Sequence, residues 1–523
     1  MIRHELQKLI LTALKEENFT RGVSLSIPLT AAHGDYATSL ALSLAKKTRQ
    51  DPLEVAQRLR SQILKFKPTT GFLEKIEVAP PGFINFFLSP SCLQKEVEQI
   101  LKEKERYGSL KTGRSQKVQI EFISANPTGP LTVGNARGGF WGDVLGNVLQ
   151  RVGFKVEKAY YINDYGMQVL TLGHSVLKDD QAKYKGDYID WLNQKIEEKD
   201  PYRAGEMAAR LIIDELIKKT VTKMGIKYDE WISETWLHQS KRVEKALALL
   251  KKKNLVYEKD GASWFKSSQF GDQRDRVIIK KDDWKTYLAG DAGLHFYKFT
   301  EKKFTKVINI WGADHYGDVP GLQAVVEALG HKGKLEIILL QFVTLIEKGK
   351  ELKMSKRSGV YVTMDELLRM VGLDVARFFF LQKSADTHLN FDVDLAREQS
   401  EKNPVYYVQY AQARICSILR KTKAQKLVPK HLRLLNHSAE LALIKQLARL
   451  PEIVQDTSQD YQVQRLPQYA LDLAASFHHF YRDCRVIEQD HDLTQARLSL
   501  ILAAQTVLKN TLDLMGISAP EKM

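Results

Sequence analysis

The pattern of apolar and polar positions divides the chain into three parts. In the first part, a helical repeat from Leu40 to Arg60 precedes the strand-like segment "KIEVAPPGFINFFLS", which predicts a mixed α/β domain. From about Asp392 to the C-terminus the pattern is helical almost throughout, which predicts a helix bundle. The part between them alternates strand and helix patterns. The 523 residues suffice for about three domains.

The middle part begins with "KVQIEFIS", a run with the β-branched content of a buried strand. A glycine loop and a helix ending near Val152 follow, and this order is typical of the opening unit of a doubly wound nucleotide-binding sheet. After the strand-like "KVEKAYYIN", a mainly helical pattern from about Lys178 to Lys253 predicts an insertion between the halves of the sheet. Strand patterns return in "VIIK", "KVINIWGADH" and "LEIILLQFVTLI", which we expect to complete the sheet.

Composition restricts the class of protein. With 44% hydrophobic and 27% charged residues, the chain has the balance of a folded soluble protein. No apolar run approaches the ~18 residues of a membrane span, and the N-terminus lacks the apolar core of a secretory signal, so a cytoplasmic location is expected. Cys92, Cys416 and Cys484 are too widely spaced for a zinc site or a disulfide framework. The net charge of +15 favours a polyanionic partner, although it also fits solubility alone.

The glycine loop "NPTGPLTVGNARGGF" enters its helix with Thr132 and Asn135 on either side of the first helical residues. Free backbone N–H groups and the helix dipole make such a start an anion site, and the two side chains can add hydrogen bonds. An ordinary helix start with a capping residue explains the same residues equally well.

A second loop, "EKGKELKMSKRSG", carries lysines that can meet a phosphate, although such a loop is usually solvated surface. The two loops together point to one class of protein. A "KMSK" segment downstream of an "HxGH"-like element resembles the two-part signature of the class I aminoacyl-tRNA synthetases.

Within that class the chain resembles bacterial-type arginyl-tRNA synthetases over nearly its whole length. The resemblance rests on "EFISANPTGPL", "YINDYG", "TYLAGDAGLHFYKF", "WGADHYGDVPGLQAVVEALG", "KMSKRSG", "DVARFFFLQKSADTHLNFD", "NPVYYVQYAQARICSILR" and "LDLMGISAPEKM", in this order. It implies a multi-domain α/β protein with a Rossmann-like, doubly wound catalytic core at 113–385. A tRNA-contacting α/β domain at 1–112 and an all-α anticodon-binding bundle at 386–523 would flank the core, and the helical insertion would cover about 178–253.

The implied reaction activates L-arginine with ATP and transfers it to tRNA(Arg). Mg²⁺ would arrive bound to ATP, and no metal of the protein's own is expected. The resemblance also implies a monomer without a DNA or membrane partner, and arginine activation that requires tRNA. It assigns phosphate chemistry to Thr132, Asn135, Lys353 and Lys356, and ATP binding to Pro130, Gly134, Gly138, Gly312, His315, Met354 and Ser355. His315 equally fits a structural role.

One departure from the family pattern falls on the glycine loop. Family members usually carry His at both ends of the "HxGH" element, where this chain has Thr132 and Asn135. The loss of both is what a catalytically dead paralogue would show. However, "TxGN" resembles the version of tryptophanyl-tRNA synthetases, and an amide N–H can donate to a phosphate oxygen without a charge. We therefore expect an active enzyme.

The arginine pocket can be argued from chemistry as well. A guanidinium presents five N–H donors in a planar fork and is never neutral, so a selective pocket needs carboxylates. Glu121, Tyr287 and Asp291 match the family's guanidinium positions, and Asn126 and Asp314 match positions near the α-amino group. Alternatively, Glu121 is a satisfied buried acid and Tyr287 a core residue.

The C-terminal part places aromatic residues among arginines. We expect RNA contacts from Tyr406, Tyr410, Arg414, Tyr481 and Arg485. Unstacked bases stack on aromatic rings while guanidinium groups meet phosphate, although a tyrosine stripe at helical spacing is more often core. Two rival functions stay open: a non-catalytic tRNA-binding paralogue, which would lack pocket groups, and a nucleotidyltransferase acting on a small molecule, which the long helical C-terminal part disfavours.

Overall fold

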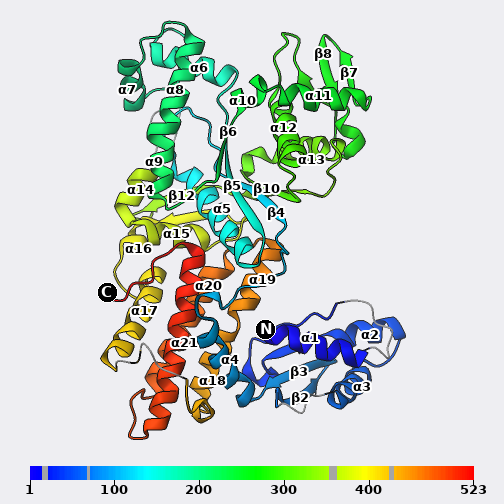
Figure 1. Cartoon of the computed structure of the whole chain (residues 1–523), viewed down its shortest axis with the longest axis vertical. Helices are drawn as coiled ribbons and strands as arrows, with labels where there is room; N and C mark the ends of the chain where they lie inside the picture. Colours follow the sequence, from blue (N-terminus) through cyan, green and yellow to red (C-terminus); the bar gives the residue numbers. More distant parts are fainter. Residues whose placement is uncertain (15–21, 67–70, 353–361, 423, 425–428) are drawn as a thin grey trace.

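A computed structural model describes residues 1–14, 22–66, 71–352, 362–422, 424 and 429–523. Figure 1 shows a helix bundle with the N-terminal domain at its side and the parallel sheet above it, and two lobes rising beyond the sheet. Lys353, Met354, Ser355 and Lys356 lie outside the described residues.

The N-terminal domain is the expected mixed α/β unit. Its elements are α1 (Ile2–Ala13), β1 (Tyr36–Thr38), α2 (Leu40–Thr48), α3 (Pro52–Lys65), β2 (Leu73–Ala79), β3 (Phe83–Leu88) and α4 (Pro90–Glu103). The strands form an antiparallel sheet in the order β1-β3-β2. The Tyr36 hydroxyl donates to Glu452 Oε1 at 2.7 Å, and Arg3 also pairs with Glu452, so buried polar contacts attach this domain to the bundle.

The core is a five-stranded parallel sheet in the order β11-β10-β4-β5-β6. The strands are β4 (Lys117–Glu121), β5 (Lys155–Ile162), β6 (Glu230–Ser233), β10 (Lys306–Gly312) and β11 (Leu335–Leu340). After β4 the chain enters α5 (Val133–Arg151) and continues to β5, whereas β10 pairs on the other side of β4. The connections therefore reverse direction between β4 and β10, and ligands of doubly wound sheets bind at the carboxyl ends of the strands beside such a reversal.

The expectation that "VIIK" helps to complete this sheet is wrong. Its residues belong to β9 (Arg276–Ile279), which pairs antiparallel with β8 (Ala262–Phe265) beside β7 (Val256–Lys259). The run "LEIILLQFVTLI" is two strands, because the chain leaves the parallel sheet after β11. Its second half is β12 (Val343–Glu347), which pairs with β13 (Lys350–Glu351) and β14 (Leu389–Asp392).

The prediction of an uninterrupted helical insertion over 178–253 also needs correction, because the edge strand β6 lies inside that span. The helical lobe (residues 164–229) follows β5. It contains α6 (Met167–Leu177), α7 (Asp187–Lys195), α8 (Pro201–Leu211), a π-helix (Ile212–Ile217) and α9 (Lys218–Lys223).

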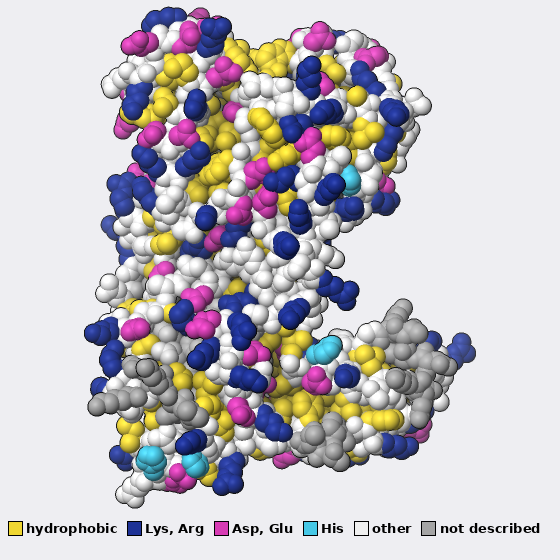
Figure 2. Space-filling model, in the orientation of Figure 1, with side chains coloured by type: hydrophobic (Ala, Val, Ile, Leu, Met, Phe, Trp, Pro, Cys, Tyr) yellow, Lys and Arg dark blue, Asp and Glu magenta, His cyan; other side chains and the backbone are white. Residues whose placement is uncertain are grey.

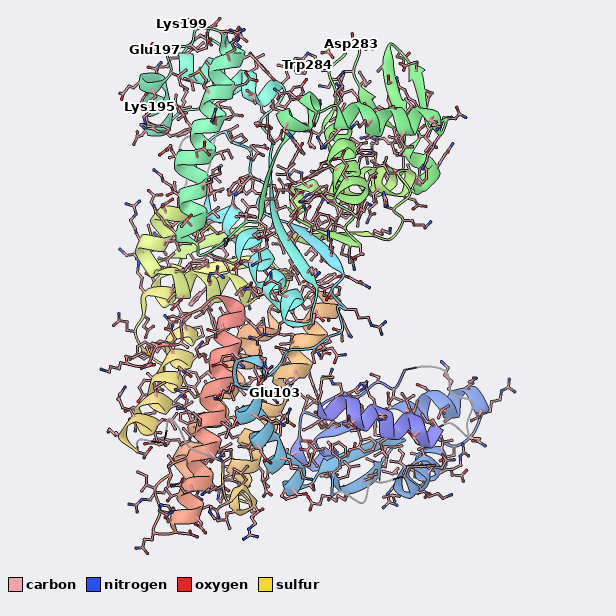
Figure 3. All side chains as sticks on the ribbon, in the orientation of Figure 1. Glu103, Lys195, Glu197, Lys199, Asp283 and Trp284 are labelled. Atoms are coloured by element: carbon pink, nitrogen blue, oxygen red, sulfur yellow. The ribbon has the colours of Figure 1, made fainter. Side chains whose placement is uncertain are left out.

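The second lobe (residues 234–301) follows β6. It contains α10 (Glu234–Gln239), α11 (Arg242–Lys252), the sheet β7-β8-β9, α12 (Tyr287–Phe296) and a second π-helix (Tyr297–Glu301). Figure 3 places Lys195, Glu197 and Lys199 at the outer end of the helical lobe, and Asp283 and Trp284 at the outer end of the second lobe. Because β5 and β6 lead into the lobes at their carboxyl ends, both lobes are attached to the ligand-binding edge of the sheet.

The remaining elements cover the sheet and form the bundle, which agrees with the expected helical C-terminal part. They are α13 (Val319–Ala328), α14 (Met364–Val371), α15 (Leu373–Leu381), α16 (Val393–Arg397), α17 (Pro404–Lys421), α18 (Ser438–Ala448), α19 (Leu450–Asp460), α20 (Arg465–Asp483) and α21 (His491–Met515). Arg377 of α15 is buried, pairs with Asp143 of α5 at 2.8 Å and donates to the carbonyl oxygens of Met224 and Met515. One guanidinium thus connects the core, the helical lobe and the bundle.

Candidate active site

The glycine loop and the segment after the basic loop lie side by side. Val133 N–H donates to the Val362 carbonyl at 3.3 Å, and Met364 N–H donates to the Leu131 carbonyl at 2.9 Å. Thr132 and Thr363 form an isolated antiparallel bridge. Val362 is the first described residue after the "KMSK" segment, so these backbone bonds join the chain that follows the second loop to the start of α5.

At the start of α5, Thr132 and Asn135 form a capping box. The backbone N–H and the hydroxyl of Thr132 both donate to Asn135 Oδ1 at 3.0 Å. A backbone N–H can only donate, so the amide atom facing it is oxygen, and Nδ2 with its two hydrogens points elsewhere. No described residue accepts a hydrogen bond from Nδ2. One residue therefore caps the helix with its oxygen and keeps a free donor.

The described residues predicted for ATP lie at the start of α5 and at the carboxyl end of β10. Gly134 is exposed and Gly138 is half-buried, and a Cβ added at Gly138 would make an ordinary contact of 3.8 Å with the Ile123 nitrogen. Gly312 ends β10, and His315 follows in an exposed 3-10 helix (Ala313–Asp318). Its Nε2 lies 3.7 Å from Asp314 Oδ2, and its Nδ1 lies 3.6 Å from Asp318 Oδ2. Pro130 lines a cavity of about 670 Å³ between α9 and α14.

Glu121 occupies the carboxyl end of β4 and is 4% exposed. Its Oε2 lies 2.5 Å from Lys298 Nζ, and its Oε1 accepts from the Ser124 hydroxyl at 3.1 Å. Lys298 is completely buried, which a lysine tolerates only with a partner. Neither Lys298 nor Ser124 was expected from the sequence, because "HFYKFTEKK" resembles ordinary charged surface.

Asp291 lies on α12 and faces other acids. Loss of water around its carboxyl group, together with the negative charges of Glu121 and Glu234, raises the pKa of Asp291 to about 8. Among the described residues, none forms a hydrogen bond or an ion pair with this carboxyl group. Glu234, which sequence reasoning missed, is 5% exposed, and its Oε1 lies 3.8 Å from His238 Nε2. Glu121, Glu234 and Asp291 thus place three carboxyl groups near one another, with Lys298 paired to Glu121, and a further cation would stabilise this site.

The other residues predicted for arginine lie at the edge of this acidic cluster. Tyr287 begins α12 one turn before Asp291 and is 60% exposed, and burial and then Glu234 raise its pKa. Asn126 follows β4 and accepts from Asn163 Nδ2 at 3.1 Å. The structure therefore brings Asp291 near Glu121, with Tyr287 one turn before Asp291 on α12, whereas Asp314 is exposed beside His315 in the 3-10 helix after β10.

The residues predicted for RNA lie on the bundle. Tyr406, Tyr410 and Arg414 follow one face of α17 at four-residue spacing, and the two tyrosine rings stack at 6.4 Å with an angle of 7°. Arg414 donates to the Tyr481 hydroxyl of α20 at 3.0 Å. His478, which we did not expect, stacks on Tyr410 at 6.0 Å. We call Tyr406, Tyr410, Arg414, His478 and Tyr481 the aromatic face.

Arg485 lies just beyond α20 and is exposed. Figure 2 shows that lysine and arginine side chains are spread over the whole face in view rather than gathered in one patch. Within the described part of the chain, no group of three or more His, Cys, Asp or Glu side chains is placed to hold a metal ion. Likewise, none of the helices in the described ranges is long and apolar enough to cross a membrane.

A doubly wound parallel sheet, a glycine loop beside its reversal point, a chain segment after the basic loop that pairs with that glycine loop, and a helical C-terminal part define a class I aminoacyl-tRNA synthetase. Family models agree with each part. Residues 1–88 match the arginyl tRNA synthetase N terminal domain, 96–194 and 190–393 match the class I (R) catalytic domain, and 408–523 match the DALR anticodon binding domain. The chain belongs to the arginyl-tRNA synthetase family.

Known arginine–tRNA ligases match this chain over nearly its full length. An arginine–tRNA ligase of Moorella thermoacetica is 43% identical over 95% of this chain and 93% of its own, and one of Bacillus subtilis is 40% identical over 100% and 98%. A putative arginyl tRNA synthetase structure from Campylobacter jejuni, at 33% identity, covers 83% of this chain and 100% of its own with a TM-score of 0.75. The Thermus thermophilus arginyl-tRNA synthetase, at 24% identity, has the same fold over 100% of both chains with a TM-score of 0.81.

Proposed function

We propose that this chain is an active arginine–tRNA ligase. It activates L-arginine with ATP to arginyl adenylate, transfers arginine to the 3′-terminal ribose of tRNA(Arg), and releases AMP and pyrophosphate. The observation that carries this proposal is the acidic cluster, in which the charges of Glu121 and Glu234 act on the buried Asp291 carboxyl group and one buried lysine, Lys298, pairs with Glu121. A guanidinium supplies the missing positive charge and enough N–H donors for two carboxylates, whereas the ammonium of lysine offers no planar fork.

In the first step the arginine carboxylate attacks the α-phosphorus of ATP, and pyrophosphate leaves. The protein contributes position and stabilisation of the developing negative charge rather than covalent chemistry. Asn135 Nδ2, Thr132 and the backbone N–H of Gly134, for which no described residue is an acceptor, suit this role, and Lys353 and Lys356 would add positive charge. Mg²⁺ enters bound to the phosphates of ATP.

The remaining assignments complete the substrate contacts. Nucleotide contacts are proposed for Pro130, Gly134, Gly138, Gly312, His315, Met354 and Ser355. Asn126 and Asp314 are proposed for the α-amino end of arginine, and Tyr287 for the guanidinium. The aromatic face and Arg485 would meet the anticodon arm of tRNA(Arg).

We further propose a division of labour among residues 1–112, 113–385 and 386–523, in which the first part contacts tRNA, the second catalyses and the third reads the anticodon arm. The active form would be a monomer in the cytoplasm, where tRNA(Arg) is used. A tRNA-binding paralogue without activity fits less well, because the carboxylates of the pocket are all present.

Aminoacylation of total tRNA with each amino acid in turn tests the proposal. Arginine should be the amino acid that is charged, and only in the presence of ATP. Charging of another amino acid, or binding of tRNA without any charging, would refute it.

A further inference from the structure

A row of buried polar groups connects the two elements that carry the pocket carboxylates. Lys298 Nζ pairs with Glu121 Oε2 and lies 3.5 Å from Asn309 Oδ1. Asn309 Nδ2 lies 3.2 Å from His295 Nε2, and His295 Nδ1 lies 2.8 Å from the Asp291 carbonyl. Glu121, Lys298, Asn309 and His295 are all at most 4% exposed.

The hydrogen bonds of this row fix its protonation state. The Asp291 carbonyl can only accept, so Nδ1 of His295 carries the hydrogen and Nε2 accepts from the Asn309 amide. Burial, and then the charge of Lys298, lower the pKa of His295 well below its ordinary value, which keeps the ring neutral. Asn309 Oδ1 is then free to face the Lys298 ammonium. The row therefore presents an acceptor, Asn309 Oδ1, to the amino group of Lys298, which also pairs with Glu121 Oε2.

Glu121 is held from its other side by a strained turn. Ile123 and Ser124 have φ values of 65° and 38°, in the left-handed region that a β-branched residue rarely adopts. This turn places the Ser124 oxygen where it accepts from the Tyr161 N–H at 3.1 Å and donates to Glu121 Oε1 at 3.1 Å. Both carboxylate oxygens of Glu121 thus have a protein partner without any ligand.

We propose that Lys298 is a positioning residue for arginine recognition: its buried ammonium holds the Glu121 carboxylate in one orientation and offsets part of the negative charge of the acidic cluster. The proposal rests on the proposed function, in which this cluster binds the arginine guanidinium. Lys298 acts through Glu121 and is not expected to touch the substrate. Its location in a π-helix, a rare turn that is frequent at functional sites, fits this role.

Replacement of Lys298 should change arginine recognition selectively. In Lys298→Met, which keeps the length of the side chain and removes the charge, we expect the KM for arginine to rise at least tenfold, on the order of one lost charge-assisted contact. The KM for ATP should change less than twofold, because the phosphate end of the site is unaltered. Lys298→Arg, which keeps the charge, should recover most of the arginine affinity. Pyrophosphate exchange in the presence of tRNA measures both constants.

The pH profile separates a positioning role from a merely structural one. The charges that face Asp291 are Glu121 on β4, Glu234 on α10, Asp318 after β10 and Lys298, of which only Lys298 favours ionisation. Its loss should move the rise of kcat/KM for arginine to higher pH by about one pH unit. An equal loss of activity at every pH with an unchanged arginine KM would overturn the proposal.

A matched control is available four residues along the chain. Lys302 is partly exposed and pairs with Glu157 and Glu230, away from Glu121. Lys302→Met removes the same charge, and its arginine KM and pH profile should remain those of the wild type. If Lys302→Met reproduces the shift, the effect of Lys298 is general electrostatics and the proposal is wrong.

Circular dichroism shows whether Lys298→Met folds. If it does not, Glu121→Gln is compared with the double variant Glu121→Gln/Lys298→Met. The neutral amide at position 121 removes the carboxylate that the loss of Lys298 would leave buried without a partner. Measured at a pH above the rise of kcat/KM, where the ionisation of Asp291 no longer contributes, a lysine that orients Glu121 should then add less than a twofold change in arginine KM. A larger change would contradict the proposal.

Failure of this inference can be distinguished from failure of the proposed function. If the wild-type protein charges tRNA with arginine and Lys298→Met has a normal arginine KM, only the inference is refuted. If the wild-type protein does not charge arginine, the proposed function is refuted as well.

Discussion

The arginine pocket and the surfaces proposed to face phosphate are built in opposite ways. In the pocket, Glu121 and Glu234 are nearly inaccessible, and Glu121 has protein partners at both oxygens. At the start of α5, Gly134 is exposed and Asn135 is half-buried, although Thr132 is buried, and the groups of the aromatic face are half-buried or exposed. Asn135 Nδ2 has no partner among the described residues, and Tyr410 is 38% exposed.

The difference follows from what each ligand requires. A planar guanidinium is distinguished from an ammonium by direction, so its acceptors must be fixed before it arrives. A phosphate is recognised mainly by charge and by N–H donors, which a helix start and flexible basic side chains provide without a buried network. We expect substitutions in the pocket to change selectivity for arginine, and substitutions at the phosphate-facing surfaces to change the chemical rate or tRNA affinity.

The largest effect is expected at Asn135. If Nδ2 donates to a phosphate oxygen that gains charge during adenylate formation, Asn135→Ala should slow this step by about 10² to 10³. Arginine and tRNA binding should remain near those of the wild type. Single-turnover adenylate formation in the presence of tRNA measures the rate.

Asn135→Asp distinguishes the two roles of the side chain, the capping oxygen and the N–H donor. The aspartate keeps an oxygen for the N–H and hydroxyl of Thr132, so the capping box is retained, but it has no N–H to donate and adds negative charge beside the phosphates. It should therefore be at least as slow as Asn135→Ala. If Asn135→Asp is fast and Asn135→Ala only loses about 1 kcal/mol of stability, the residue is merely a cap.

The next largest effect is expected at Asp291. Asp291→Ala should raise the KM for arginine by about 10- to 150-fold, because it removes a charge-assisted partner worth about 1.5 to 3 kcal/mol. The KM for ATP should hardly change. Steady-state pyrophosphate exchange tests both, and a normal KM for arginine would mean that the guanidinium binds elsewhere.

The sequence predicted the parts of the site that follow from local pattern. A strand, a glycine loop and a helix start predict where β4 and α5 meet, and thereby where Glu121 and Thr132 lie. The strand "VIIK" was correctly predicted as a strand but assigned to the wrong sheet, because β-branched content does not identify the partner strand. The edge strand β6 was missed because its four residues lie within a helical pattern.

The residues that preset the pocket could not be predicted, because their role depends on tertiary contacts. Lys298 belongs to a lysine-rich stretch, and its burial depends on the π-helix after α12, which brings it beside Glu121 of β4 and Asn309 of β10. Glu234 lies at the start of a short helix, where an acid is normally explained by the helix dipole. A strand-end acid such as Glu121 carried a stronger signal, because a charge in a buried strand needs a partner.

A smaller effect is expected from pH. Arginine needs ionised Asp291, so at pH values below about 8 binding must displace a proton from the carboxyl group, and arginine affinity should rise up to about tenfold per pH unit towards 8. Calorimetry at neutral pH in buffers of different ionisation enthalpy should detect this released proton. An affinity that does not change between pH 6 and 8 would contradict an acidic cluster with one unpaired carboxyl group.

The same shift predicts a stability change with a defined sign. The pKa of Asp291 is raised in the folded protein from 3.8 to about 8, so ionisation of this group lowers the stability of the free protein as pH rises through this range. Bound arginine supplies a cation beside the ionised Asp291 and so restores the stability that ionisation removes. Saturating arginine should therefore raise Tm more at pH 8 than at pH 6.

The smallest effect is expected on the aromatic face, where an exposed ring stacks on a base instead of filling a preset pocket. Tyr410→Ala should weaken tRNA binding by about 1 kcal/mol, close to fivefold, and Tyr410→Phe should bind like the wild type because it keeps the ring.

Arg414→Ala should affect tRNA binding in a different way from Tyr410→Ala. It removes a charge, so the slope of log Kd against log salt should fall by about one, whereas Tyr410→Ala should leave the slope unchanged. Filter binding of tRNA over a range of salt concentrations tests both. If Tyr410→Ala changes the arginine KM instead of the tRNA affinity, the aromatic face affects arginine binding in the catalytic core rather than tRNA binding. The proposed difference between the aromatic face and the arginine pocket would then be wrong.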